Sequence, residues 1–187
     1  MGQELLFLED SYVKECAASV AGVQNGRYVF LDRVLFYPEG GGQPHDTGEL
    51  IRDGNGNAFK VTGVRKRDGI VWVEIEGTGL AQDDGVKCIL NWERRYALMR
   101  MHSAAHVLAS FFYKMGGAKI TGNQLGTDRG RFDFSMPSFD REKMVGFVDA
   151  ANSAISKCIG IKTYTLPYDC LLYTSDAADE EDSVDLG

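Results

Sequence analysis

The chain has few of the features that mark secreted or membrane proteins. Its 187 residues include only four cysteines, Cys16, Cys88, Cys158 and Cys170, and no two of them are close in the sequence. A disulfide framework normally has closely spaced cysteines, so we expect reduced thiols and a cytoplasmic location. No run of 18 apolar residues occurs, and the first ten residues lack the basic start and apolar core of a signal peptide. We therefore expect no membrane span.

Positive charge is also scarce, because 20 Lys and Arg residues stand against 27 Asp and Glu residues, a net charge of −7. Six of the acidic residues lie in residues 170–187, which contain no Lys or Arg, so the rest of the chain holds 21 acidic and 20 basic residues. A local basic surface for nucleic acid is therefore not excluded. The hydrophobic content of 44% is enough for a packed core and excludes global disorder.

The last stretch, CLLYTSDAADEEDSVDLG, continues neither a helical nor a strand pattern. An acidic disordered tail would explain its composition. We favour a different interpretation, because CLLYTSDAADE resembles the in-frame translation of a common sequencing adapter. On this interpretation residues 170–187 are a non-native tail, the native sequence is truncated near Asp169, and Cys170 is not a candidate ligand.

Residues 1–91 are predicted to form a β-rich domain. Short segments rich in strand-forming residues are separated by turns that contain glycine, such as Gln24-Asn25-Gly26. The predicted strands are Val20–Val23, Arg27–Leu31, Thr47–Ile51, Ala58–Val64, Ile70–Ile75 and Val86–Leu90. Six short strands joined by glycine turns predict a small, glycine-rich β-barrel.

Within this domain, residues 36–48 read FYPEGGGQPHDTG. Consecutive glycines let the backbone adopt positive φ and approach a ligand closely, although a wide loop between two barrel strands would look the same. The segment is not a phosphate-binding P-loop, because it lacks the GK[ST] ending. His45 is a conceivable metal ligand, but a single histidine in a loop is usually just exposed.

Residues 92–115 have the period of one amphipathic helix, with Asn91 as N-cap and Gly116-Gly117 at its end. The predicted apolar face comprises Met101, Ala104, Ala105, Leu108, Phe111 and Met115. His102 and His106 are four residues apart, so both imidazoles leave the same side of the helix. They could bind one zinc ion, or they could form a hydrogen-bonded histidine pair. Ser103 stands where a HExxH protease has its glutamate, which counts against that class.

The remaining elements complete an α+β domain that we place at residues 92–169. Arg129 and Arg131 are predicted to lie on one side of a strand, where they could hold phosphate or carboxylate or simply be solvated and ion-paired. A second helix is predicted from Phe139 to Ile159, with Ser138 as cap, Gly160 at its end and a further strand at residues 161–166. Its predicted buried line is Val145, Val148, Ile155 and Ile159.

Three segments, taken together and in order, resemble the freestanding alanyl-tRNA editing proteins and the editing domain of alanyl-tRNA synthetases. They are LDRVLFYPEGGGQPHDTG, WERRYALMRMHSAAHVL and TDRGRFDFSM, and the resemblance covers residues 4–169. It implies an α+β fold in which a glycine-rich β-barrel precedes an editing domain of the threonyl- and alanyl-tRNA synthetase type. It also implies a zinc-dependent hydrolase that removes serine or glycine wrongly attached to alanine tRNA.

The same resemblance assigns candidate site residues. His102 and His106 match the first zinc pair of the family, HxxxH, and are the expected metal and catalytic residues. Residues Gly40, Gly41, Gly42 and Gln43 match a glycine-rich loop that influences editing. Val34 stands where the family often has a threonine that recognises serine, which leaves the amino-acid preference open. The second zinc pair, CxxxH, is absent from this sequence, so we expect half a zinc site here and an inactive truncated chain.

The substrate would be the ester between an amino acid and the 3′ end of tRNA. Arg94, Arg95, Arg129 and Arg131 are the candidates for contacts with tRNA phosphates. Two other functions remain open at this point. One is a tRNA-binding module that does not hydrolyse its ligand, and the other is an unrelated metallohydrolase that acts on small esters or amides. The sequence does not indicate an oligomeric state.

Overall fold

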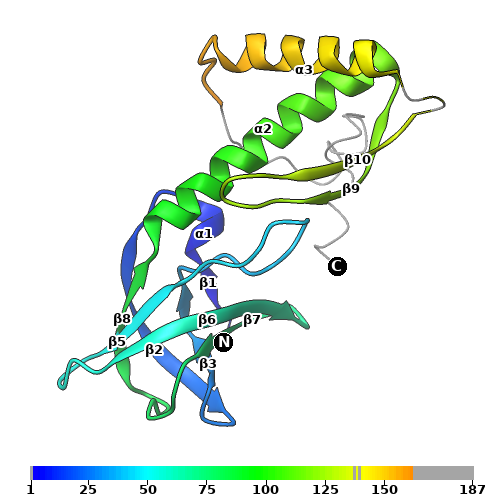
Figure 1. Ribbon diagram of the computed structural model, residues 1–187. Coiled ribbons are helices and arrows are strands. Elements are labelled where there is room, and N and C mark those ends of the chain that lie inside the picture. The colour runs from blue at the N-terminus through cyan, green and yellow to red at the C-terminus, as the bar shows by residue number, and fades with distance from the viewer. Residues whose placement is uncertain (1, 137, 139, 162–187) are drawn as a thin grey trace. The chain divides into compact units, whose positions relative to one another are not determined.

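The computed structural model describes residues 2–136, 138 and 140–161, and it divides the chain into two compact units, Met1–Leu98 and Met99–Gly187 (Figure 1). The first unit thus ends inside the long helix and not at Asn91, where we placed the domain boundary. The predicted strand at 161–166 extends beyond the described residues, and the tail at 170–187 lies outside them. No helix in the described part of the chain is long and apolar enough to span a membrane.

The first unit contains a closed six-stranded barrel in which neighbouring strands are antiparallel, in the order β2-β3-β7-β6-β5-β8. Its strands are β2 (Glu15–Gln24), β3 (Tyr28–Leu31), β5 (Gly48–Arg52), β6 (Ala58–Arg67), β7 (Ile70–Ile75) and β8 (Gly85–Leu90). Each corresponds to one of the six predicted strands, so the predicted barrel is confirmed. Outside the barrel, β1 (Glu4–Leu5) pairs in parallel with β4 (Arg33–Val34), and α1 (Leu6–Glu9) is a single short turn.

Alternating side chains of the strands fill the barrel interior. In β7 the buried Val71, Val73 and Ile75 alternate with Trp72 and Glu74, which remain partly exposed. This is the period-two pattern of a strand with one face in the core. A fully buried valine or leucine contributes about 1.5–3 kcal/mol relative to an exposed one, so the apolar interior is the main source of stability for this unit.

A buried ion pair attaches the start of α2 (Trp92–Gly116) to the rest of the first unit. Arg95 is 2% exposed and Asp46 is fully buried. The Arg95 guanidinium donates from Nε to Asp46 Oδ2 at 2.8 Å, and from its other two nitrogens to the carbonyl oxygens of Ser11 and Leu35 at 3.0 and 2.9 Å. The backbone N–H of Tyr37 also donates to Asp46 Oδ2, at 2.6 Å. Both charges are therefore neutralised in the interior.

Helix α2 begins and ends as predicted, but its buried face agrees only in part. Asn91 accepts a hydrogen bond from the Arg94 N–H at 3.1 Å, which confirms the N-cap, and Gly117 has a φ of +64° just beyond the last turn. The buried apolar residues are Leu98, Ala105 and Phe112, seven apart. Of the predicted face, Ala105 is buried and Leu108 packs against the Phe112 core, whereas Met115 is 53% exposed.

In the second unit, a hairpin of β9 (Lys119–Gln124) and β10 (Arg131–Ser135) follows α2, and α3 (Arg141–Ile155) comes next. A small core forms around Phe112, whose ring lies 4.1 Å from Phe134 and 5.2 Å from Phe147, measured between ring centroids. Gly116 leaves room for Phe147, because a Cβ there would lie 2.8 Å from the Phe147 ring. The aromatic rings, contributed by three different elements, therefore define this core.

Three predictions about α3 are wrong. Its N-cap is Asp140, which accepts from the N–H groups of Glu142 and Lys143, and not Ser138. The helix ends at Ile155, so it does not reach the predicted Ile159 or Gly160. The predicted buried line, Val145, Val148, Ile155 and Ile159, is 39–72% exposed. The helix buries Phe147 and Ala151 instead, because Phe147 fits beside Gly116 and contacts Phe112.

We predict that Arg95→Met lowers the free energy of unfolding by about 3–5 kcal/mol, because it leaves the buried Asp46 carboxylate without a counter-charge. Urea denaturation followed by tryptophan fluorescence measures this loss. Arg94→Met is the control, because Arg94 is only half-buried and bonds a single carbonyl oxygen. Replacing both partners, in Asp46→Leu with Arg95→Met, should recover much of the stability. Equal stability losses in the two single variants would contradict the assignment.

Candidate functional site

The two predicted ligand histidines lie one helical turn apart on α2, and their side chains meet. His102 and His106 are both half-buried, their rings are stacked with an interplanar angle of 17°, and their Nε2 atoms are 3.0 Å apart. In this state one imidazole donates a hydrogen bond and the other accepts it, so the hydrogen-bonded pair that we considered is present. The predicted placement of both rings on one side of the helix is confirmed.

The geometry of the pair also suits a shared metal ion. Two imidazoles that bind one tetrahedral zinc at about 2.0–2.1 Å have their nitrogens about 3.3 Å apart. The observed Nε2 separation is within a few tenths of an ångström of that value. The separation of the two nitrogens therefore matches that of two zinc ligands, although the nearly parallel rings would have to turn before both lone pairs pointed at one ion. In the described residues, no group of three or more His, Cys, Asp and Glu residues is arranged to hold a metal.

His45, the third histidine, makes a local contact in the first unit. Its Nδ1 atom lies 2.7 Å from the backbone oxygen of Asp46, and its own backbone oxygen accepts two hydrogen bonds from Arg94, at 3.0 and 3.1 Å. Arg94 is therefore half-buried and engaged with the chain that follows the glycine-rich segment. This engagement weakens the case for Arg94 as a phosphate contact.

The glycine-rich segment forms a tight two-residue turn. The backbones of Gly40 and Gln43 exchange two hydrogen bonds, of 2.8 and 3.1 Å, and Gly41 and Gly42 have φ angles of +55° and +77°. These angles match a type I′ turn, which requires positive φ at both central positions. Gly41 and Gly42 are exposed, whereas Gln43 is buried at 5%. The turn thus presents bare backbone to solvent, and Gln43 anchors its base.

Two predicted contact residues are corrected by their burial. Val34 is fully buried in the barrel core, where β4 pairs with β1, so its side chain has no surface with which to meet a substrate. Arg95 was a candidate for a phosphate contact, but all of its guanidinium nitrogens bond inside the protein. A desolvated, fully bonded guanidinium is not available to RNA.

The two arginines near β10, Arg129 and Arg131, are both exposed, but only Arg131 lies on the strand. Arg131 donates to Asp133 Oδ1 on the same strand, at 3.1 and 3.2 Å, which is the ion-paired alternative that we considered. Arg129 precedes the strand and lies in the connection from β9. Exposed ion pairs of this kind contribute about 0–1 kcal/mol, so Arg131 can exchange its partner at little cost.

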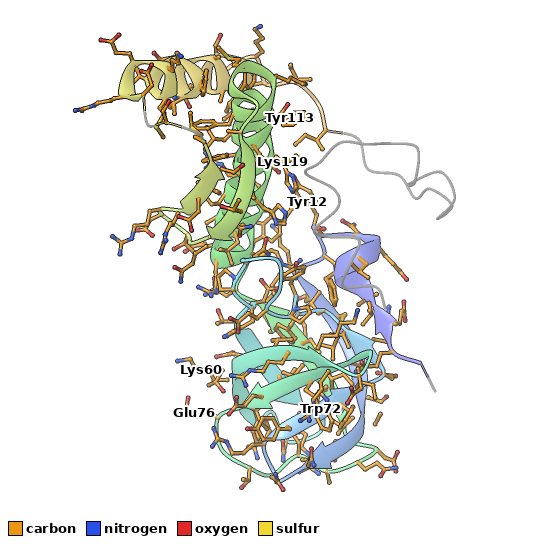
Figure 2. All side chains as sticks on the ribbon, turned by 90° about the vertical axis from the view of Figure 1, so that its right-hand side faces the viewer. Tyr12, Lys60, Trp72, Glu76, Tyr113 and Lys119 are labelled. Atoms are coloured by element: carbon orange, nitrogen blue, oxygen red, sulfur yellow. The ribbon has the colours of Figure 1, made fainter. Side chains whose placement is uncertain are left out.

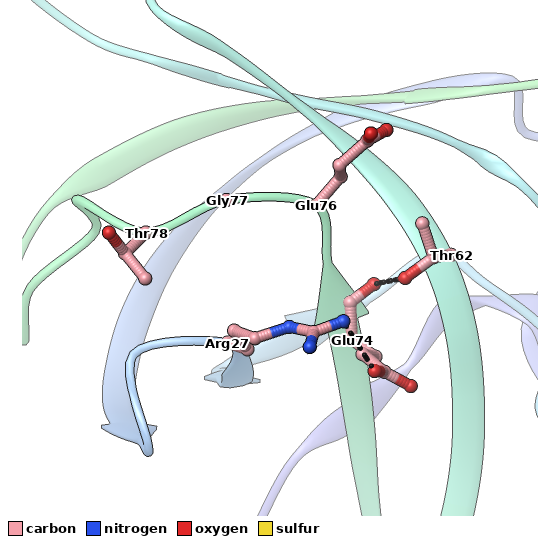
Figure 3. Close-up of a pocket in the computed structure, with 6 residues that line it drawn as sticks. All are labelled: Arg27, Thr62, Glu74, Glu76, Gly77 and Thr78. Carbon is pink, nitrogen blue, oxygen red and sulfur yellow. Dashed lines mark hydrogen bonds and ion pairs between the residues drawn. The ribbon is translucent and has the colours of Figure 1, made fainter.

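Two further features of the barrel were not found in the sequence. A pocket of about 630 Å³ on its surface is lined by Arg27, Thr62, Glu74, Glu76, Gly77 and Thr78 (Figure 3). Figure 3 shows the Arg27 guanidinium turned to Glu74, at 3.0 Å, so the pocket has no spare positive charge for an anion. The sequence pattern that could have indicated this pocket is the strand alternation, which places Thr62 and Glu74 on the outer face of the barrel.

The second feature is a pair of cysteines, because Cys16 on β2 lies directly opposite Cys88 on β8. A hydrogen bond with Cys88 lowers the pKa of the Cys16 thiol, with a further contribution from Arg33. The same hydrogen bond, followed by burial, raises the pKa of Cys88. Both cysteines are free thiols, as expected.

Comparison with known proteins identifies the family. The family described as tRNA synthetases class II (A) matches residues 6–94. The chain is 46% identical over 165 residues to the alanyl-tRNA editing protein AlaX-M of Methanosarcina barkeri, which covers 86% of this chain and 68% of that protein. It is 36% identical over 166 residues to the AlaX-M protein of Saccharolobus solfataricus, covering 88% of this chain and 69% of that protein.

The chain is also 35% identical over 167 residues to the alanine–tRNA ligase of Pyrobaculum aerophilum, but it covers only 18% of that longer protein. It spans about two thirds of the length of the AlaX-M proteins that it matches. The match to these proteins extends over both units and includes the glycine-rich segment and the histidine pair. On this similarity, the chain belongs to the alanyl-tRNA editing protein family.

Proposed function

We propose that this protein is a trans-editing hydrolase that removes serine, or glycine, from wrongly charged alanine tRNA. The family supplies the enzyme class, ester hydrolysis on an aminoacyl-tRNA, and makes tRNA the partner. The observation that carries the proposal is the separation of 3.0 Å between the Nε2 atoms of His102 and His106. Two half-buried imidazoles at this separation are close enough to bind one metal ion, as a metal-assisted deacylase would require.

Zinc is the proposed cofactor, held by His102 and His106 together with a second pair of ligands, CxxxH in the family, that does not occur in this sequence. Neutral imidazole is a preferred zinc ligand, and a catalytic zinc usually keeps one position open. When bound, the ion would supply a Lewis acid for the ester or its attacking water, or an anchor for the substrate amine. The histidine side chains must be deprotonated at Nε2 to bind it, so zinc affinity should fall as the pair becomes protonated.

Other residues of the chain would hold the RNA. The Gly40–Gln43 turn exposes backbone N–H groups with no side chain in the way, which suits close approach of an RNA strand. Arg129 is exposed, and Arg131 is held only by a surface ion pair, so both remain candidates for phosphate contacts. In the first unit, the burial of Arg95 and the bonds of Arg94 to His45 leave these two arginines in structural roles.

One observation favours a second candidate, a tRNA-binding module that does not hydrolyse its ligand. The described residues provide two histidine ligands and no third group arranged with them. Two imidazoles alone bind zinc weakly. Measuring deacylation and tRNA binding on the same preparation separates the two functions, because a module would bind tRNA and release no amino acid.

We predict that, in a protein that also carries the second zinc pair CxxxH, His102→Ala and His106→Ala each abolish stoichiometric zinc binding. Each should also lower deacylation of serine-charged alanine tRNA by about two orders of magnitude or more, because each removes a direct ligand. Metal content is measured by mass spectrometry, and hydrolysis by release of labelled serine. His45→Ala is the matched control and should keep both properties. A His102→Ala protein that retains one zinc per chain would refute the proposed site.

We predict that Val34→Thr lowers the free energy of unfolding by about 1–3 kcal/mol and leaves the preference for serine over alanine unchanged. The reason is that the new hydroxyl would be buried in an apolar core and could not reach the substrate. Chemical denaturation and paired deacylation assays test the two parts. Val29→Thr, at another fully buried barrel valine, is the control for stability. A gain in serine preference for Val34→Thr alone would show that position 34 faces the substrate.

A further inference from the structure

The outer end of the β6–β7 hairpin carries a concentration of positive charge. Arg65, Lys66 and Arg67 are consecutive and exposed, and the turn that follows has Asp68 and Gly69 at positive φ. Strand β5 pairs with β6 only from Ala58 to Val61, so the basic end of β6 is paired to β7 beyond the point where β5 stops. Figure 1 shows this end of the hairpin projecting from the barrel.

Aromatic side chains lie beside these cations on the outside of the barrel. Arg65 is directly opposite Trp72 on β7, and the Trp72 ring contacts Phe30 on β3, with the ring planes 60° apart. Both rings are partly exposed, because they alternate with buried residues of their strands. Figure 2 shows Trp72 on the barrel, with Lys60 also on this unit. On the next strand, Gly22 lies opposite Phe30 and adds no side chain over its ring.

The charges of Arg65 and Arg67 are available to a ligand, unlike most arginine charge in the first unit. Arg27, Arg33, Arg52 and Arg95 are each paired with a carboxylate at 3.0 Å or less. By contrast, Arg65 has no hydrogen-bond or ion-pair partner among the residues that the structure describes. Arg67 approaches Asp68 only to 3.9 Å, with both side chains at least 85% exposed, and such a pair contributes little.

The hairpin end is also next to the glycine-rich segment. The backbone N–H of Glu39, one residue before the glycines, donates to the Val64 carbonyl at 3.0 Å. Val64 immediately precedes Arg65, so the exposed backbone of the Gly41–Gly42 turn and the basic end of β6 belong to one region of the first unit. An RNA strand that contacted the exposed glycine backbone would therefore also lie within the electrostatic field of Arg65 and Arg67.

We propose that Arg65, Arg67 and Trp72 form an RNA-binding surface, with the two guanidinium groups on backbone phosphates and the indole stacked on an unpaired base. Arginine and aromatic side chains on the outer face of a β-sheet are a recurring means of holding single-stranded nucleic acid. The inference rests on the proposed function, which makes tRNA the ligand, and it assigns part of the tRNA contact to the barrel.

The test is the double variant Arg65→Ala/Arg67→Ala in the full chain, with alanine tRNA titrated by fluorescence anisotropy at several salt concentrations. Loss of two phosphate contacts should weaken binding about tenfold near 0.1 M salt and reduce the slope of log affinity against log salt by about 1.4–1.8. The control, Lys60→Ala/Lys87→Ala, removes the same charge elsewhere on the barrel and should change the slope less. Equal effects of the two double variants would overturn the proposal.

Stacking has its own readout, because the chain contains only two tryptophans, Trp72 and Trp92. In Trp92→Phe, emission comes from Trp72 alone, and saturating tRNA should quench it. Unchanged emission at saturation would overturn the role of Trp72.

Deacylation separates this inference from the proposed function. Where hydrolysis is measurable, Arg65→Ala/Arg67→Ala should raise KM about tenfold and leave kcat unchanged, because a phosphate contact that is equally strong in the ground state and the transition state affects binding alone. If the unmodified protein binds tRNA and hydrolyses it while the variant is unaffected, only the surface is refuted. If the unmodified protein does not bind tRNA, both the surface and the proposed function are refuted.

Discussion

The buried ion pair between Asp46 and Arg95 fixes how the start of α2 is attached to the first unit. It connects the chain after the glycine-rich segment to the first turns of α2, and the remaining guanidinium nitrogens bond the carbonyl oxygens of Ser11 and Leu35. A buried charge is tolerated only when it is paired and hydrogen-bonded, so this arrangement allows few alternatives. Among the described residues, Asp46 Oδ1 has no partner, which makes the surrounding bonds to Oδ2 still more important. The first turn of α2 and the chain after the glycine-rich segment are therefore held by one desolvated contact.

The second unit carries the two imidazoles of the histidine pair on one helix. Packing of Phe112 against Phe134 and Phe147 secures α2 along one side. His102 and His106 lie half-buried on that helix, with their Nε2 atoms at hydrogen-bonding distance. Helical geometry alone brings the two rings together, because residues four apart lie on the same side of a helix.

The arginine residues fall into two groups, those whose guanidinium is bonded within the protein and those whose charge is exposed to solvent. Arg95 pairs with the buried Asp46, Arg94 donates to the backbone oxygen of His45, and the remaining three pair with carboxylates, namely Arg27, Arg33 and Arg52. Arg65, Arg67 and Arg129 keep their charge in solvent. In a chain of net negative charge, such local cations rather than the overall balance decide where a polyanion can bind.

The sequence by itself determined what depends on near neighbours in the chain. Alternation and glycine turns predicted the six barrel strands, helical spacing placed His102 beside His106, and Asn91 capped the helix as expected. Tertiary structure alone decided the features that depend on distant partners. The sequence suggested that Arg95 was an exposed cation, but in the structure it is buried and paired with Asp46, which is distant in the sequence. Val34 lies in a core shared by many strands, and α3 turned Phe147 inward because Gly116 and Phe112 made room for its ring. Local periodicity reports which residues share a face, but the buried face is chosen by the shape and charge of whatever packs against it.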